Sequence, residues 1–200
     1  NAQRVQVFIR EKGIEIPTEQ LNVREGKQFL EPFTSMNPFH CVPFLELDDG
    51  TVISESISIC RYLEEIYPNP ALFGTTAEAR AIIDMWLRRF ELDGFLPMLH
   101  AVRNHLENFK GRVITGTRTD LPQVPQMVTR GIEMGKMFLE RVEPHMAENE
   151  FVAGSRFSVA DITAFFTIKL TTPLKIDINA SYPGVAAWMD WMSKREAFNI

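Results

Sequence analysis

Ser54-Glu55-Ser56 stands at the predicted start of a helix, directly after a predicted strand. In a structural interpretation, a serine hydroxyl caps a free backbone N–H group and Glu55 complements the helix dipole. In a functional interpretation, the free N–H groups, the Ser56 hydroxyl and the dipole hold a carboxylate, while Glu55 binds an ammonium group. The second interpretation describes a site for the head group of an α-amino acid.

The loop Asn37-Pro38-Phe39-His40-Cys41-Val42-Pro43 leads into a predicted strand and is the second candidate element. A proline here belongs at the start of a strand, because it has no N–H to donate to the sheet. If the Val42–Pro43 bond is cis, the turn directs the N–H and C=O of Val42 toward solvent or a ligand. The alternative is a proline with a purely structural role.

Ser158 and Asp161 have the spacing of a capping box ahead of an apolar run. In this arrangement the serine hydroxyl binds a backbone N–H of the first turn, and the carboxylate binds the backbone N–H of the serine. The pattern predicts the start of a helix and no catalytic role.

The cysteines and the other histidines form no predicted site. Cys41 is a candidate nucleophile in this loop, but it lies on the side of Val42 that is unsuited to thiol exchange, and Cys60 is expected to be a small buried residue. His100 and His105 are five residues apart and do not share a helix face, and His145 is far away in the sequence. The sequence therefore predicts no metal site.

Short elements that must position these residues make up the first third of the chain. We expect a helix over 2–12, a strand over 20–23, a short irregular helix over 27–36, a hairpin of 42–47 and 51–53 around Asp48-Asp49-Gly50, and a helix over 54–67. A parallel crossover needs a strand on each side, and the helix over 2–12 has none before it. We therefore expect a missing first strand upstream of Asn1.

Long helical patterns follow residues 72–76. Apolar spacing predicts helices over 78–108, 125–148, 158–171 and 184–193, with a polar loop over 111–125. Pro97 lies inside the first of these and is expected to bend it. The chain thus divides into a small α/β domain at residues 1–72 and an all-helical domain at residues 77–200.

The composition excludes several classes of protein. With 21 Lys+Arg, 26 Asp+Glu and a net charge of −5 over 200 residues, the chain lacks the basic clusters of a nucleic-acid binder. No apolar run approaches the roughly 20 residues of a membrane helix, and no secretory signal is recognised. Two cysteines cannot build a disulfide framework. We therefore expect a cytoplasmic protein with no nucleic-acid and no membrane partner.

The order and spacing of these motifs resemble the soluble glutathione S-transferase family over essentially the whole chain. The Val-Pro loop, the Asp-Asp-Gly hairpin and the Glu-Ser helix start look like its thioredoxin-like domain, which binds glutathione. Segments 154–162 and 182–188 are similar to the capping-box helix and a late helix of its all-helical domain. The loop at 37–43 resembles insect delta-type enzymes, whereas residues 45–56 look like bacterial members.

The resemblance implies a role for each matched residue. Glu55 and Ser56 match the pair that holds the γ-glutamyl end of glutathione. Val42 matches the residue whose backbone pairs with the cysteinyl part, and Pro43 matches the family's cis-proline. His40 matches the delta-type histidine that contacts the glycyl carboxylate. These five residues form the expected glutathione site.

The residue that activates the thiol is a Ser, Tyr or Cys just after the first strand in the family, a place that would lie before or at Asn1. The thiol must be deprotonated to be a nucleophile near neutral pH. Some bacterial members have an asparagine near the sulfur, so Asn1 is the candidate here, and an ordinary helix N-cap is the alternative. His100 and Arg103 are the candidates for the second-substrate pocket, with a solvated helix face as the alternative.

We therefore expect a cytoplasmic glutathione S-transferase of the kind used in detoxification. It would use glutathione as co-substrate and a small apolar electrophile as its partner, and would form a homodimer through the first two long helices of the all-helical domain. The alternatives are a non-catalytic binding or regulatory protein of the same fold, or a glutathione-dependent isomerase, dehalogenase or disulfide reductase.

Overall fold

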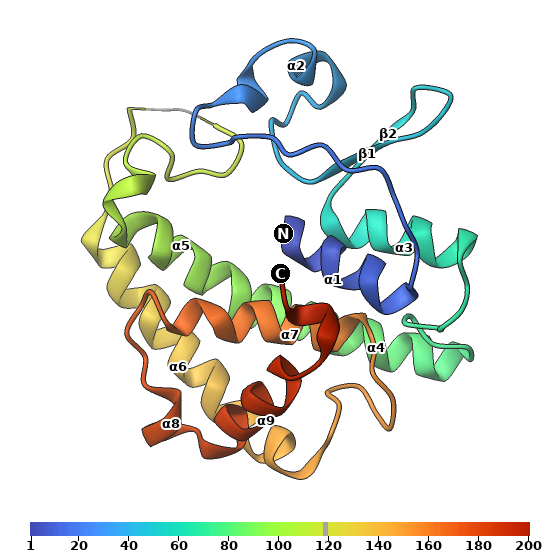
Figure 1. Cartoon of the computed structure of the whole chain (residues 1–200). Helices are drawn as coiled ribbons and strands as arrows, with labels where there is room; N and C mark the ends of the chain where they lie inside the picture. Colours follow the sequence, from blue (N-terminus) through green and yellow to red (C-terminus); the bar gives the residue numbers. More distant parts are fainter. Residues whose placement is uncertain (118–119) are drawn as a thin grey trace.

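The computed structural model describes residues 1–117 and 120–200 (Figure 1). Helix α1 (Ala2–Lys12) ends at Gly13, whose φ of 63° is in the left-handed region that glycine adopts without a Cβ penalty. Two strands, β1 (Phe44–Glu46) and β2 (Val52–Ser54), form an antiparallel hairpin in which Leu45 pairs with Ile53. The predicted hairpin and first helix are both confirmed.

The expected strand over residues 20–23 is wrong. Residues 14–22 run without regular structure, and Val23 enters a turn in which its carbonyl accepts from the N–H of Gly26 at 3.3 Å. A strand requires a neighbour for its backbone groups, and in the described part of the chain this segment is paired with none. The region after it contains η1 (Lys27–Phe29) and α2 (Phe33–Met36), and α3 (Ser56–Ile66) follows the hairpin.

The long helix expected over residues 78–108 is divided into three parts. Thr76 caps α4 (Ala77–Arg89) by accepting from the N–H of Ala79 at 3.1 Å. A π-helical segment, η2 (Phe90–Phe95), then leads into α5 (Leu96–His105). The π-helical segment ends two residues before Pro97, whose ring and missing N–H disfavour a regular α-helical turn at this place.

Helices form the rest of the chain. They are η3 (Glu107–Phe109), α6 (Pro125–Glu148), α7 (Val159–Ile168), η4 (Lys169–Thr171), α8 (Ile178–Ser181), α9 (Pro183–Ser193) and η5 (Glu196–Phe198). The capping box that starts α7 is confirmed: the Asp161 carboxylate accepts from the Ser158 N–H at 2.8 Å. It also accepts from the N–H of Val152 at 2.8 Å, so this fully buried side chain ties the preceding loop to the helix.

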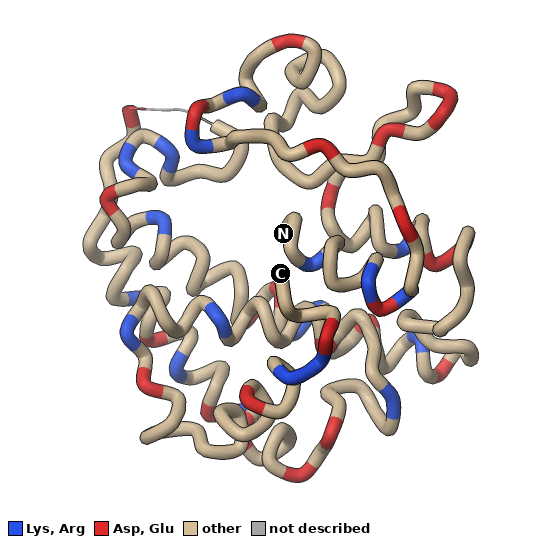
Figure 2. The backbone as a smooth tube through the Cα atoms, in the orientation of Figure 1, with Lys and Arg blue, Asp and Glu red and all other residues tan. Residues whose placement is uncertain are grey.

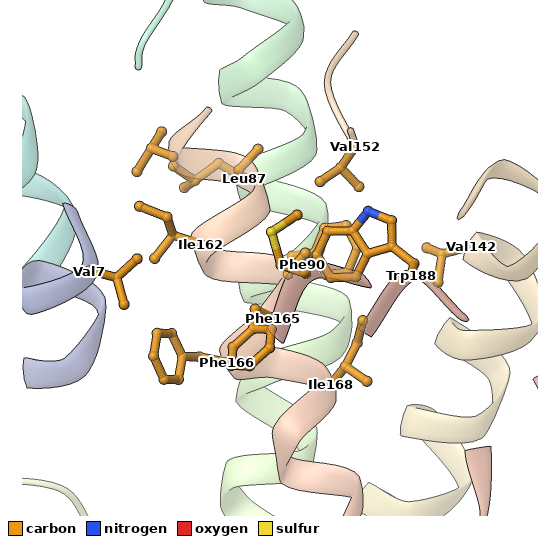
Figure 3. Packing of buried hydrophobic residues seen from close by; sticks show 14 of the residues in the cluster. Val7, Leu87, Phe90, Val142, Val152, Ile162, Phe165, Phe166, Ile168 and Trp188 are labelled. Atoms are coloured by element: carbon orange, nitrogen blue, oxygen red, sulfur yellow. The ribbon is translucent and has the colours of Figure 1, made fainter. Parts of the chain in front are cut away.

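One apolar core joins the α/β part to the helical part. Every residue of α7 is buried, and α1 packs against it on one side and against α3 on the other. Figure 3 shows Val7 of α1 facing Ile162 of α7, with Leu87 of α4 and Phe90 of η2 close by. Helix α1 is therefore held by both parts, and the residues at its start have a fixed position relative to η2.

A buried ion pair fixes the connection between the two parts. The Lys12 ammonium contacts the Glu64 carboxylate and donates to the carbonyls of Tyr67 and Pro70 at 2.7 and 2.6 Å. The same carboxylate accepts from the N–H groups of Leu72 and Phe73 at 3.3 and 3.0 Å. The end of α1 thus organises the segment that leads to α4.

Acidic and basic residues are interspersed over both parts of the molecule (Figure 2). Among the helices that the structure describes, none combines the length and the apolar character required to cross a membrane.

Candidate functional site

A cavity of about 320 Å³ lies between the α/β part and the stretch from α4 to α5. Its walls come from the start of α1, the loop before β1, the start of α3, the stretch from α4 to α5, and the loop after η3. The lining residues are Asn1, Arg4, Cys41, Val42, Pro43, Glu55, Ser56, Arg88, Glu91, Leu92, Phe95, Leu96, Leu99 and Thr115. Asn1, Val42, Pro43, Glu55 and Ser56, all selected from the sequence, are therefore brought together around one space.

The loop before β1 is organised by Asn37. This buried side chain donates from Nδ2 to the Cys41 carbonyl at 2.8 Å and accepts at Oδ1 from the Phe39 N–H at 3.2 Å. The Val42–Pro43 bond that follows is cis. This role of Asn37 was not predicted from the sequence, although an asparagine at the start of a turn commonly binds nearby backbone groups in this way.

The start of α3 faces the cavity with Ser56, which is 4% exposed. Glu55 is the N-cap residue, has φ 70° and ψ 125°, and makes no cap hydrogen bond with its side chain. The Glu55 side chain is exposed at the rim. The amide groups at this helix end are therefore available to an anion, as the functional interpretation of Ser54-Glu55-Ser56 requires.

Asn1 lies on the cavity wall at the start of α1. Its carbonyl accepts from the Arg4 N–H at 3.0 Å, but its side chain makes no cap hydrogen bond with the helix. The side chain is thus not engaged as the N-cap that was the alternative interpretation.

His40 lies in the same loop as Val42 but is not among the residues that line the cavity. Its ring packs against Phe29 with 5.0 Å between ring centroids. Its Nδ1 is buried, with no hydrogen-bond partner in residues 1–117 and 120–200.

His100 and Arg103 are not brought into this cavity. Arg103 donates to the carbonyl of Arg112 and stacks on the ring of Phe109 at 4.9 Å, so the structure gives it a role in holding the loop after α5. Burial, with the nearby Arg112 charge, lowers the pKa of Arg103.

Leu92, Phe95, Leu96 and Leu99 form the apolar wall instead. Their spacing of three, four and seven residues is that of one helix face, which sequence reasoning assigns equally well to a core. Leu92 and Leu96 are half exposed, which distinguishes this wall from the core of the molecule.

Arg4 and Glu91 are two further cavity residues that the sequence analysis missed. They belong to α1 and η2, 87 positions apart, and Nη1 of Arg4 lies 3.5 Å from Oε1 of Glu91. No local pattern relates such distant residues, so their pairing could be found only from the fold.

The two cysteine thiols are not poised for nucleophilic attack. Burial raises the pKa of the Cys41 thiol, and the Glu55 charge raises it further. Burial raises the pKa of Cys60 to about 12. Because the thiolate is the reactive form of cysteine, neither side chain is a strong nucleophile near neutral pH.

A loop from the helical part packs on the loop before β1. Gly116 has φ 72°, and a Cβ at this position would collide with the Phe39 carbonyl oxygen and approach the Cys41 sulfur to 2.8 Å. The neighbouring Thr115 lines the cavity. The cavity is therefore closed on this side by a glycine-dependent contact.

Among the residues that the structure describes, no three His, Cys, Asp or Glu side chains are placed to hold a metal ion.

Comparison with known proteins finds matches over both parts of the chain. The family model described as the N-terminal domain of glutathione S-transferase matches residues 1–66, and the model of the C-terminal domain matches residues 132–196. A solved glutathione S-transferase of class Gtt2 from Vibrio parahaemolyticus is 34% identical, with a TM-score of 0.83 over 98% of this chain and 90% of that chain.

Two curated relatives come from animals. Glutathione S-transferase 1 of Manduca sexta is 29% identical over 89% of this chain and 76% of its own length. Maleylacetoacetate isomerase of Rattus norvegicus is 27% identical over 98% of this chain and 85% of its own length.

Proposed function

This chain belongs to the glutathione S-transferase family, and we propose that it binds glutathione in the cavity beside Ser56 and activates the thiol for attack on an apolar electrophile. The observation that carries the proposal is the meeting of three features in one cavity. These are the open start of α3, the backbone at Val42, and the apolar wall of η2 and α5.

The γ-glutamyl end of glutathione fits the start of α3. The Ser56 hydroxyl and the first amides of the helix donate to its carboxylate, and the positive end of the helix dipole adds to the attraction. The exposed carboxylate of Glu55 binds its ammonium group. One residue pair thus recognises both charges of an α-amino acid head.

The rest of the peptide runs along the loop before β1. The cysteinyl part pairs with the backbone of Val42, which the cis bond to Pro43 and the side chain of Asn37 hold in place. The glycyl carboxylate is directed toward His40, which precedes Val42 by two residues in the same loop and matches the family histidine that contacts this group. We assign the glutathione site to His40, Val42, Pro43, Glu55 and Ser56.

The electrophile binds against Leu92, Phe95, Leu96 and Leu99 rather than at His100 and Arg103, because only the first group lines the cavity. Asn1 is the side chain assigned to the sulfur, since it lies on the same wall and is not occupied as a helix cap. The thiol loses its proton to solvent, and the thiolate sulfur forms a bond to the electrophilic carbon as the carbon–halogen bond of an aryl halide breaks and halide leaves, or as the C–O bond of an epoxide opens to an alkoxide that takes up a proton.

The outer face of the helical part supports a homodimer. Ile82 and Met85 on α4 and Met127, Met134 and Met137 on α6 are large apolar side chains that are substantially exposed. Exposed apolar side chains of this size on helices are typical of a subunit interface. We propose a dimer through α4 and α6, in the cytoplasm, where the two free cysteines stay reduced.

A second candidate function is glutathione-dependent isomerisation, because the chain is similar to a maleylacetoacetate isomerase over nearly its whole length. Both functions use the same glutathione site and differ in the second substrate.

Calorimetry with a series of peptides tests the proposed site. Glutathione should bind, whereas cysteinylglycine, which lacks the γ-glutamyl group, should bind about tenfold or more weakly, since it leaves Ser56 and Glu55 without their charged partners. Equal affinity for both would place the ligand elsewhere. Conjugation of glutathione to an aryl halide or an epoxide would then indicate transferase activity, and glutathione-dependent isomerisation of a maleyl ester would indicate isomerase activity.

A further inference from the structure

Arg4 is a buried cation on the cavity wall whose guanidinium group is only partly paired. Its side chain is 3% exposed. Nη1 is 3.5 Å from Oε1 of Glu91, a long contact, whereas Nε and Nη2 have no hydrogen-bond partner in the described chain. Both of these nitrogens are inaccessible to bulk water, so solvent does not compensate the charge either.

The carboxylate that faces Arg4 is shared. Oε2 of Glu91 accepts from Nη1 of Arg88 at 3.1 Å, so one carboxylate serves two guanidinium groups. The other carboxylate on the cavity wall, Glu55, is the one assigned to the ammonium of glutathione. The region around Arg4 and Glu91 therefore has a surplus of positive charge.

The position of this charge is fixed by packing. The guanidinium carbon lies 4.1 Å from the centre of the Phe95 ring, and Phe95 is part of the apolar wall assigned to the electrophile. Arg4 is three residues after Asn1 on α1, a helix that the core holds on both sides. Burial lowers the pKa of Arg4 to about 10, so the guanidinium group stays charged at neutral pH. Burying this charge costs free energy, and a nearby anion reduces that cost.

We propose that the positive charge of Arg4 stabilises the thiolate of glutathione bound in this cavity. The inference rests on the proposed function, and it adds to that function an electrostatic source of thiol activation that does not depend on a hydrogen-bond donor to the sulfur. The step is a simple ionisation, in which the S–H proton leaves to solvent and the electron pair stays on sulfur. A positive charge within a few ångströms lowers the pKa of an acid by about 1–3 units.

The test is the pKa of the bound thiol, measured from the ultraviolet absorbance of the thiolate and from the pH profile of kcat/KM with chlorodinitrobenzene. In Arg4→Gln the thiol pKa should rise by about one unit or more, and kcat/KM below that pKa should fall about tenfold. The dissociation constant of glutathione at low pH, where the thiol is neutral in both proteins, should change little. Arg4→Lys should recover most of the shift because it keeps the charge.

Two further variants keep the test decisive. Glu91→Gln removes the shared carboxylate and should lower the thiol pKa, the opposite direction from Arg4→Gln; it decides the matter if Arg4→Gln does not fold. Arg89→Gln is the matched control, since it removes an equal charge from an exposed position of α4 that does not line the cavity. An unchanged thiol pKa in Arg4→Gln or in Glu91→Gln, with glutathione still bound and turned over, overturns the role of Arg4 and leaves the proposed function intact. Failure of the wild-type protein to bind glutathione overturns both.

Discussion

Glu55 combines a binding role with an unfavourable backbone conformation, and separating the two gives the most specific prediction. Its φ of 70° and ψ of 125° lie outside the regions that a residue with a Cβ adopts readily. We compare Glu55→Ala, which removes the carboxylate and keeps the Cβ, with Glu55→Gly, which removes both.

The expected difference follows from two opposing effects. Relief of the strained conformation stabilises the glycine variant by about 1–3 kcal/mol. The greater freedom of glycine in the unfolded chain lowers its stability by about 0.4–1 kcal/mol. The free energy of unfolding should therefore be higher for Glu55→Gly than for Glu55→Ala, by about 1 kcal/mol at the middle of both ranges and by about 2.5 kcal/mol at most.

Urea unfolding measures this difference, and calorimetry measures glutathione binding by the same two proteins. Both variants should bind glutathione more weakly than the wild type, because both lack the partner of the ammonium group. A glycine variant that is less stable than the alanine variant would refute the strain. Wild-type affinity in both variants would refute the assignment of Glu55 to the ligand.

Two further predictions concern the buried carboxylates. Glu64→Ala leaves the buried Lys12 ammonium without its counter-charge and two N–H groups without their acceptor, and should cost about 3–5 kcal/mol in urea unfolding, whereas a loss below about 1 kcal/mol would contradict the network. Burial raises the pKa of Asp161 from 3.8 to about 6, against the donors that bind its charged form. The folded state therefore holds this proton more tightly than the unfolded state, and the stability contributed by Asp161 is lost as the pH rises from 4 to 6, by about 3 kcal/mol. The free energy of unfolding of the wild type should accordingly fall relative to that of Asp161→Asn between pH 4 and pH 6. A constant difference in this free energy between the two proteins would show that the carboxylate is charged throughout the interval.

Much of the local structure could be predicted because short-range chemistry determines it. The Asp-Asp-Gly turn identified the hairpin, with Gly50 at φ 84°, and the spacing of Ser158 and Asp161 identified the start of α7. Val42 and Ser56 were selected because a strand start and a helix start each have an identifiable sequence pattern. These local patterns do not predict that the two residues meet in one cavity, and that expectation came from the family resemblance.

The remaining features depend on contacts between distant segments. Arg4 looks like any polar helix residue in the sequence, and its proximity to Glu91 and Phe95 depends on how α1 packs against the helical part. His100 was predicted for the pocket, but an α-helix turns by about 100° per residue, so the residue after Leu99 points away from the face that Leu99 shares with Leu96.

The strained backbone of Glu55 is equally invisible to sequence reasoning. The residue type gives no indication of a positive φ, because glutamate rarely adopts one, and the conformation arises where β2 meets α3. Strain of this kind persists only where the surrounding structure enforces it, and it is frequent at ligand sites.

The central claim is that the start of α3 holds the γ-glutamyl end of glutathione, and calorimetry of Ser56→Ala tests it most directly. The wild-type protein should bind glutathione, and loss of the Ser56 hydroxyl should weaken binding by about 1–3 kcal/mol, roughly 5- to 150-fold in the dissociation constant. Ser181→Ala, an equal change at an exposed position of α8 that does not line a cavity at the start of α3, should bind as the wild type does. Absence of binding by the wild type at millimolar glutathione, or an unchanged dissociation constant in Ser56→Ala, would contradict the claim.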